Sequence, residues 1–124
     1  MTPHSAKAKG RRLQQKIRDV LLEYVGNTYN LNDDDIRSTA MGQHGEDIQL
    51  SSKARKVLPF NFEIKNQEKL NIWSALTQAE LESTHRDTIP VVVFKRNHSK
   101  TYLTIEFDKF INFWSEYLKL KNDK

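Results

Sequence analysis

The spacing of apolar residues along the chain predicts three helices. Apolar side chains recur every three or four positions over residues 10–24, 70–82 and 107–118. This is the period of a helix with one buried face. Gly26 and Asn27 follow the first of these stretches and form a typical helix stop signal.

A period of two, together with one continuous apolar run, predicts four strands. Residues 46–50, 60–65 and 101–105 alternate between apolar and polar side chains, as strands do when one face is buried. Residues 89–95 form a run rich in β-branched side chains with a continuous apolar centre, which is typical of a central strand buried on both faces. The basic connection over residues 51–59 has room for a short helical turn.

The order of these elements is helix, strand, strand, helix, strand, strand, helix. A mixed central β-sheet flanked by helices, an α/β fold, buries the apolar faces. The length of 124 residues favours one domain. Within this domain we expect residues 1–9 to form a loose basic arm, residues 30–45 to be mainly loop, and residues 119–124 to be a frayed tail.

Composition excludes several kinds of site. The chain has no cysteine, so it contains neither a disulfide nor a cysteine-based zinc site. Its four histidines are scattered without the spacing of a zinc site. The longest apolar run, residues 91–94, is far shorter than a membrane span, and the basic N-terminus lacks the apolar segment of a signal peptide. We therefore expect a cytoplasmic protein without a membrane partner.

Charge is unevenly distributed, although the formal net charge is only +4. Residues 1–30 carry six Lys or Arg against two acids, and residues 31–52 carry five acids against one Arg. Residues 53–72 return to five basic side chains against two acidic ones. An acidic island between basic flanks is the arrangement of a metal site beside phosphate contacts, but ordinary surface patchiness produces the same pattern.

Asp47, Glu63 and Lys65 form the candidate catalytic site. Glu63 and Lys65 are two positions apart on a predicted strand, so both project from one face. If the strand that contains Asp47 pairs with this strand, its carboxylate comes alongside Glu63. Carboxylates and a backbone carbonyl, here that of Ile64, are the ligands that a hard divalent cation prefers, so we expect the metal at Asp47, Glu63 and Ile64. Lys65 would place a cation near the attacking water or the phosphate.

Asp47 followed by Glu63-Ile64-Lys65 resembles the Asp…Glu-x-Lys signature of the PD-(D/E)xK nuclease superfamily. The order of elements over about residues 10–115 is similar to that of its small single-domain members, the Holliday-junction-resolvase-like and phage-encoded endonucleases. The resemblance implies a restriction-endonuclease-like fold. It also implies a Mg²⁺- or Mn²⁺-dependent endodeoxyribonuclease that acts in a prokaryotic or phage-infected host cell.

The same resemblance points to a residue on the first helix. In the resolvases a Gly-x-x-x-Glu opens this helix and the Glu assists the metal site, and Gly10 and Gln14 occupy the matching positions here. A neutral amide can hold a metal-bound water through its oxygen but contributes no charge. The acidic run of residues 33–35 is an alternative third acid, although it also fits a helix cap or a solvated turn.

Two residues of the second predicted helix bear on the site. In several families of the superfamily a polar residue of the helix after the Glu-x-Lys strand faces the site, which implies a catalytic role for Gln78; an exposed helical Gln is the alternative. Trp73 shares its spacing with Leu70 and Leu76, so we expect its indole to lie in the core rather than to stack on bases.

Candidate contacts to nucleic acid lie in the basic segments on both sides of the acidic island. Their Lys and Arg side chains can bind phosphates, although a solvated surface role is the alternative for each. The glycine-containing loop of residues 41–45 would let a phosphate backbone approach closely, with His44 interpreted as a bystander. The residues assigned to nucleic-acid binding are Lys9, Arg11, Arg12, Ser38, Lys53, Arg55 and Lys56.

The sequence therefore predicts a metal-dependent DNA endonuclease, with branched DNA such as a Holliday junction as the substrate that the resemblance implies. Two matched cuts across a junction need two sites, so we expect a homodimer. One alternative is a less selective nuclease that nicks or degrades DNA. Another is a non-catalytic nucleic-acid-binding module, which the neutral side chain at Gln14 favours.

Overall fold

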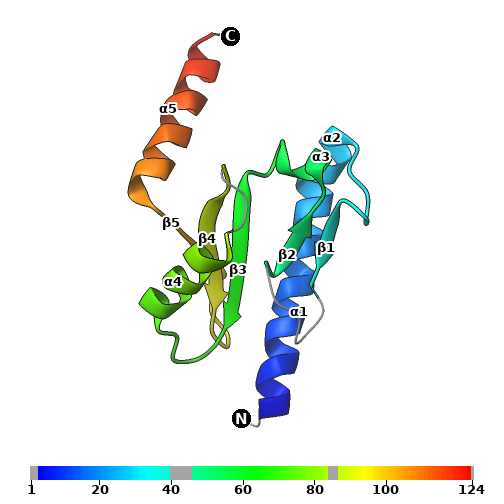
Figure 1. The fold of residues 1–124 in the computed structure, drawn as a ribbon, viewed down its shortest axis with the longest axis vertical. Coiled ribbons are helices and arrows are strands. Elements are labelled where there is room, and N and C mark those ends of the chain that lie inside the picture. The colour runs from blue at the N-terminus through cyan, green and yellow to red at the C-terminus, as the bar shows by residue number, and fades with distance from the viewer. Residues whose placement is uncertain (1–2, 40–45, 84–86, 124) are drawn as a thin grey trace.

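The computed structural model describes residues 3–39, 46–83 and 87–123 (Figure 1). The helical elements are α1 (Pro3–Leu21), the π-helix η1 (Leu22–Gly26), α2 (Asn27–Tyr29), α3 (Ser52–Arg55), α4 (Ile72–Glu82) and α5 (Phe107–Asn122). The strands are β1 (Ile36–Ser38), β2 (Ile48–Leu50), β3 (Phe60–Asn66), β4 (Ile89–Lys95) and β5 (Tyr102–Ile105).

A three-stranded mixed sheet carries the site. Its order is β3-β4-β5, with β3 parallel to β4 and β4 antiparallel to β5. Glu63 lies opposite Val92, and Val92 lies opposite Thr104. The predicted α/β class, a mixed sheet flanked by helices, is confirmed.

Helices cover both faces of this sheet (Figure 1). On one face, Phe62 and Ile64 pack in a core that includes Leu13 of α1 and Ile48 of β2. On the other face α4 packs against Val92 through small side chains, including Ala79. Because β3 is covered on both faces, Asn61 and Glu63 on its polar side are buried as well. The alternating pattern in the sequence indicates which residues share a face but not that the polar face is covered.

The N-terminal region differs from the prediction. Residues 3–9 are helical rather than a loose arm, since α1 begins at Pro3, a residue suited to the first turn of a helix. The helical segment also passes Gly26 and ends beyond Tyr29, where Asn30 adopts a left-handed φ of 56°. Gly26 itself has helical φ and ψ angles, and a Cβ there would lie 3.1 Å from the Leu31 carbonyl oxygen. This glycine therefore permits a close backbone approach instead of ending the helix.

The strand containing residues 48–50 was expected to neighbour β3, and this pairing is wrong. β2 pairs instead with β1, a strand inside the stretch predicted as loop, with Ile36 opposite Leu50. Ile36 is fully buried, so one apolar side chain among polar neighbours is enough to bring this segment into the core. The two strands form a separate antiparallel pair beside α1.

Two further corrections concern exposed apolar residues. Trp73 was expected in the core, but 77% of its surface is exposed, because α4 faces the sheet with Ala75 and Ala79. α5 continues to Asn122, so most of the expected frayed tail is helical. This helix projects away from the sheet (Figure 1). Its described residues are exposed along its length.

Candidate active site

Strand β3 positions Glu63 and Lys65 on the side of the sheet that faces α4. Asn61, on the same side of β3, donates a 3.0 Å hydrogen bond from Nδ2 to the Ala79 carbonyl oxygen of α4. Glu63 is only 3% exposed, and Lys65 lies within 3.4 Å of it, measured from Nζ to Oε1. The alternation of β3 thus places an acid and a cation side by side under α4.

Asp47 reaches the same place from the residue before β2. Its Oδ2 accepts a 2.6 Å hydrogen bond from the backbone N–H of Ile64. This N–H lies on the edge of β3 that does not pair with β4, so the carboxylate occupies the position of a missing neighbouring strand. The N–H and C=O of one strand residue point to the same edge, so the Ile64 carbonyl also faces this side.

Gln14 supports the backbone at Asp47. Its side chain is buried, and Nε2 donates 2.8 Å hydrogen bonds to the carbonyl oxygens of Thr39 and Asp47. Both partners are acceptors only, which identifies the nitrogen as the atom that faces them. At the position where the resolvase pattern has a Glu, this chain therefore has an amide that joins α1 to the segment carrying Asp47.

Glu82, at the end of α4, is a third acid that the sequence analysis missed. The Glu82 carboxyl group shares a hydrogen bond with the Glu63 carboxyl group. It also lies close enough to Asp47 for its negative charge to raise the pKa of Asp47. Gln78, one turn earlier, donates a 3.3 Å hydrogen bond from Nε2 to Glu82 Oε1. The signal was present in the sequence, since residues four apart on a helix share a face and Gln78 was already a candidate.

The electrostatics of this cluster favour protonated acids in the absence of a cation. Burial raises the pKa of Glu63 to about 8, with further contributions from the hydrogen bond to Glu82 and the negative charge of Asp47, while Lys65 acts in the opposite direction. Burial also raises the pKa of Asp47, opposed by the hydrogen bond from Ile64 and by Lys65. A site that holds several carboxyl groups with one ammonium has an excess of negative charge once its acids ionise.

This donor set suits a hard divalent cation. Asp47, Glu63 and Glu82 offer carboxylate oxygens, and the Ile64 carbonyl offers a fourth oxygen at the edge of β3. A cation bound there would offset the repulsion that raises the pKa of Glu63. Within the described ranges no three acids, histidines or cysteines are already arranged to hold a metal ion, so the side chains would have to rearrange around it.

Comparison with known families agrees with this geometry. Residues 5–122 match the family described as "phage putative PDDEXK endonuclease". The chain belongs to this family. The resemblance to the PD-(D/E)xK superfamily is thereby confirmed, and the mixed sheet flanked by helices is the restriction-endonuclease-like fold.

Comparison with curated proteins and with solved structures finds no match. None of the described helices is long and apolar enough to cross a membrane.

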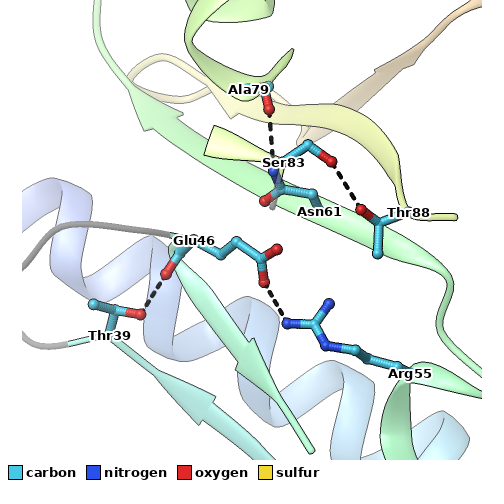
Figure 2. A network of polar contacts seen from close by, with 7 residues as sticks. All are labelled: Thr39, Glu46, Arg55, Asn61, Ala79, Ser83 and Thr88. Carbon is cyan, nitrogen blue, oxygen red and sulfur yellow. Dashed lines mark hydrogen bonds and ion pairs between the residues drawn. The ribbon is translucent and has the colours of Figure 1, made fainter. Parts of the chain in front are cut away.

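Two sets of polar contacts hold the segments on either side of the candidate site, and Figure 2 shows both. In the first, the Thr39 hydroxyl donates to the Glu46 carbonyl, and Arg55 forms a 2.8 Å ion pair with the Glu46 carboxylate. In the second, Asn61 binds the end of α4 and Ser83 binds Thr88 at 2.8 Å between hydroxyl oxygens. The first set fixes the residue before Asp47, and the second fixes the residue after Glu82.

The predicted nucleic-acid contacts separate into different environments. Arg55 is occupied by its ion pair with Glu46, and Lys53 donates a 2.6 Å hydrogen bond to the Asn30 carbonyl. Ser38 is half-buried in β1. Arg11 and Lys56 are exposed. The remaining two assigned residues are Lys9 and Arg12, which line a common pocket.

The alternative acidic run does not join the site. Asp35 accepts hydrogen bonds from the Asn32 backbone N–H and the Ser51 hydroxyl, which lower its pKa. Asp34 donates its backbone N–H to Asn32 Oδ1. These contacts are those of a turn, so the interpretation of residues 33–35 as a solvated turn holds. The loop of residues 41–45, with His44, lies outside the described residues.

Proposed function

We propose that this endonuclease is a metal-dependent DNA hydrolase whose site is built from Asp47, Glu63 and Lys65. The observation that carries the proposal is the hydrogen bond from Ile64 N–H to Asp47, which brings this acid against the Glu-x-Lys strand. The buried pair of Glu63 and Lys65 and the raised pKa of Glu63 support it, because strongly shifted acids gather at catalytic sites.

Asp47, Glu63 and the Ile64 carbonyl would hold Mg²⁺ or Mn²⁺, with Glu82 as a further ligand or as a base held by Gln78. When bound, such an ion lowers the pKa of water and stabilises charge on the phosphate. Lys65 places its ammonium beside Glu63, where it can stabilise the negative charge that develops at the scissile phosphate. Gln14 acts as a positioning residue that holds the Asp47 backbone.

We infer further that the enzyme works as a homodimer. α5 exposes a row of aromatic and aliphatic side chains that recur at helical spacing. An exposed apolar patch of this kind marks a protein interface, and a second copy of the same helix offers a matching surface across a two-fold axis. The exposed apolar residues that share this face are Phe107, Phe110, Ile111, Trp114, Tyr117 and Leu118. Phe113 lies on another face of α5, with its ring centroid 5.4 Å from that of Phe60.

A preference for branched DNA follows from the resolvase resemblance and from the need of a junction for two sites. A cleavage assay that compares four-way junction, flap, single-stranded and linear duplex DNA, each with Mg²⁺ or with EDTA, tests the proposal. Metal-dependent cleavage of the junction above the duplex is the expected result. Equal cleavage of all substrates would contradict the junction preference and favour a less selective nuclease. The absence of cleavage under every condition would contradict the proposed activity.

A further inference from the structure

A cationic pocket lies at the carboxyl ends of β3 and β4, on the face of the sheet opposite the acidic site. It has a volume of about 260 Å³. Figure 1 shows this end of β3 beside the N-terminal half of α1. Four cations and two amides surround one apolar side chain, and no acid lines the pocket. The lining residues are Lys9, Arg12, Leu13, Lys16, Asn66, Lys95 and Asn97.

Lys9 is the most informative of these residues. It is only 8% exposed, and the structure shows no hydrogen bond or ion pair to it among the residues described. The Lys9 ammonium is not among the buried polar atoms that lack a partner, so the stem of this side chain is packed while its charge remains accessible from the pocket. Such a lysine is well placed for an anion that arrives from outside.

Asn66 supplies a second, independent sign of a ligand. Its Oδ1 is buried and has no hydrogen-bond partner in the described part of the chain. Buried polar atoms are normally satisfied, and a half-turn of the amide presents Nδ2 donors at the same position. Within the described ranges, an amide oxygen without a partner and an ammonium without a partner therefore line the same cavity. Glu68 does not line it and accepts a 3.3 Å hydrogen bond from the backbone N–H of Asn97.

We propose that this pocket binds a phosphate group of the DNA strand other than the phosphate that is cleaved. Lys and Arg side chains with amide donors are the groups that bind nucleic-acid phosphates. Asn66 directly follows Lys65 but lies on the opposite face of β3, so DNA that crosses the end of this strand can contact both sites. The inference rests on the nucleic-acid substrate of the proposed function and adds a positioning contact to it.

The test measures binding of a labelled duplex by fluorescence anisotropy, in EDTA, over a range of salt concentrations. The double variant Lys9→Met/Lys95→Met removes two pocket cations, and Lys121→Met removes one near the far end of α5. A lost phosphate contact lowers the salt slope by about 1 and weakens binding about tenfold at 0.1 M salt. We expect this loss for Lys9→Met/Lys95→Met and a much smaller one for Lys121→Met.

Two further measurements separate lost phosphate binding from a folding defect and from binding of free phosphate. Lys9→Met should unfold at about the same temperature as the wild type, because Met keeps the packed part of the side chain and no hydrogen bond or ion pair of Lys9 is lost among the residues described. If Lys9→Met fails to fold, Lys16→Gln/Lys95→Gln replaces it in the same binding assay. Inorganic phosphate is then added to wild type and variant during thermal unfolding, to distinguish a DNA phosphate from a free phosphate ion.

A salt slope for Lys9→Met/Lys95→Met equal to that of Lys121→Met would overturn the proposal. A second result would also overturn it: millimolar phosphate stabilises the wild type but not the variant, and the variant binds DNA as tightly as the wild type does. The pocket would then bind a free phosphate ion and not a phosphate of DNA. Because all measurements are made without a divalent ion, they are independent of cleavage. A chain that binds DNA through this pocket but never cleaves it would contradict the proposed enzyme and leave the pocket in place.

Discussion

The Asp47 carboxylate accepts its 2.6 Å hydrogen bond from the N–H of Ile64, the residue between Glu63 and Lys65. A side chain thus occupies the open edge of β3, where a further strand would otherwise pair. This contact joins two segments that are separated in sequence by α3 and that belong to different sheets. It also brings the Asp47 carboxylate against the strand that carries Glu63, as the proposed metal site requires.

The first prediction separates catalysis from DNA binding. Glu63→Gln keeps the shape of the side chain but removes its charge, so cleavage should fall at least about 10²-fold while duplex binding in EDTA is kept. Lys65→Met should also remove most cleavage, with a modest loss of binding from the lost charge. Glu23→Gln, an exposed acid of η1, is the control and should cleave normally. Wild-type cleavage of junction, flap and duplex DNA by Glu63→Gln would place the site elsewhere.

The second prediction concerns stability against pH without metal. Folding raises the pKa of Glu63 from its ordinary 4.5 to about 8, so the folded state binds the proton more tightly than the unfolded state does. The associated stability is therefore complete below about pH 4.5 and is lost as the pH rises to about 8. Denaturant unfolding should show a loss on the order of several kcal/mol across this window, most of it from Glu63 and the rest from Asp47.

Mg²⁺ should reverse this trend at the alkaline end of the window, because it stabilises the ionised carboxylates. Matched unfolding curves at pH 8 with Mg²⁺ or EDTA provide the measurement. In Glu63→Gln the decrease of stability with pH should be much smaller. A metal-free protein whose stability rises steadily from pH 5 to pH 8, with no response to Glu63→Gln, would contradict the assigned pKa shift.

The third prediction tests Glu82, the acid at the end of α4. Both its hydrogen bond and its charge raise the pKa of Glu63, so Glu82→Gln should lower that pKa from about 8. NMR titration of the Glu63 carboxyl carbon in metal-free protein measures the change. Glu80→Gln, an exposed acid on the same helix, should leave the Glu63 titration unchanged. Identical titrations in both variants would remove Glu82 from the site.

The fourth prediction concerns Gln14. Gln14→Glu restores the acid of the resolvase pattern, but a carboxylate cannot donate to the carbonyl oxygens that Nε2 now binds. The variant should lose about 1–3 kcal/mol of stability at neutral pH and part of its activity, because two buried acceptors face a negative charge. Gln15→Glu, the exposed neighbour, is the matched control in denaturant unfolding. A Gln14→Glu protein with unchanged stability and higher activity would show instead that position 14 contacts the metal.

The fifth prediction concerns association through α5. Placing charges in the apolar row with Trp114→Glu/Leu118→Glu should give a monomer in light scattering, because a buried interface does not tolerate unpaired acids. Asn112→Glu adds an acid to the same helix outside this row and should remain dimeric. A wild-type chain that stays monomeric in the presence of four-way junction DNA would contradict the homodimer.

Several elements were predictable because their signal is local. The bounds of β4 agree with the predicted residues 89–95, since a continuous apolar run flanked by polar residues has few other structures available. The pairing of Glu63 with Lys65 on one face follows from the two-residue period of a strand, wherever the strand lies. The amphipathic spacing of α4 and α5 likewise located these helices to within a few residues.

The errors arose where a residue's role depends on distant partners. Gly26 has the local chemistry of a helix end, yet it has helical backbone angles, and its missing side chain allows the Leu31 carbonyl to approach closely. Trp73 has the spacing of a core residue, but α4 turns Ala75 and Ala79 toward the sheet, with Ile72 and Leu76 packed beside them, so the indole lies outside. In both cases the tertiary contact outweighs the local preference.

The sequence by itself therefore determined the α/β class, most of the helices and strands, and the acid–cation pair on β3, because backbone periodicity decides each of these within a few residues. Only the tertiary structure decided that Asp47 approaches β3 through its side chain, that Gln14 supports it from α1, and that Glu82 completes the acidic cluster. The same holds for the cationic pocket, whose lining comes from α1, β3, β4 and the turn after β4. Such groupings depend on how helices and strands pack, and packing is decided by side-chain volume and burial across the whole core rather than by the order of residues along one segment.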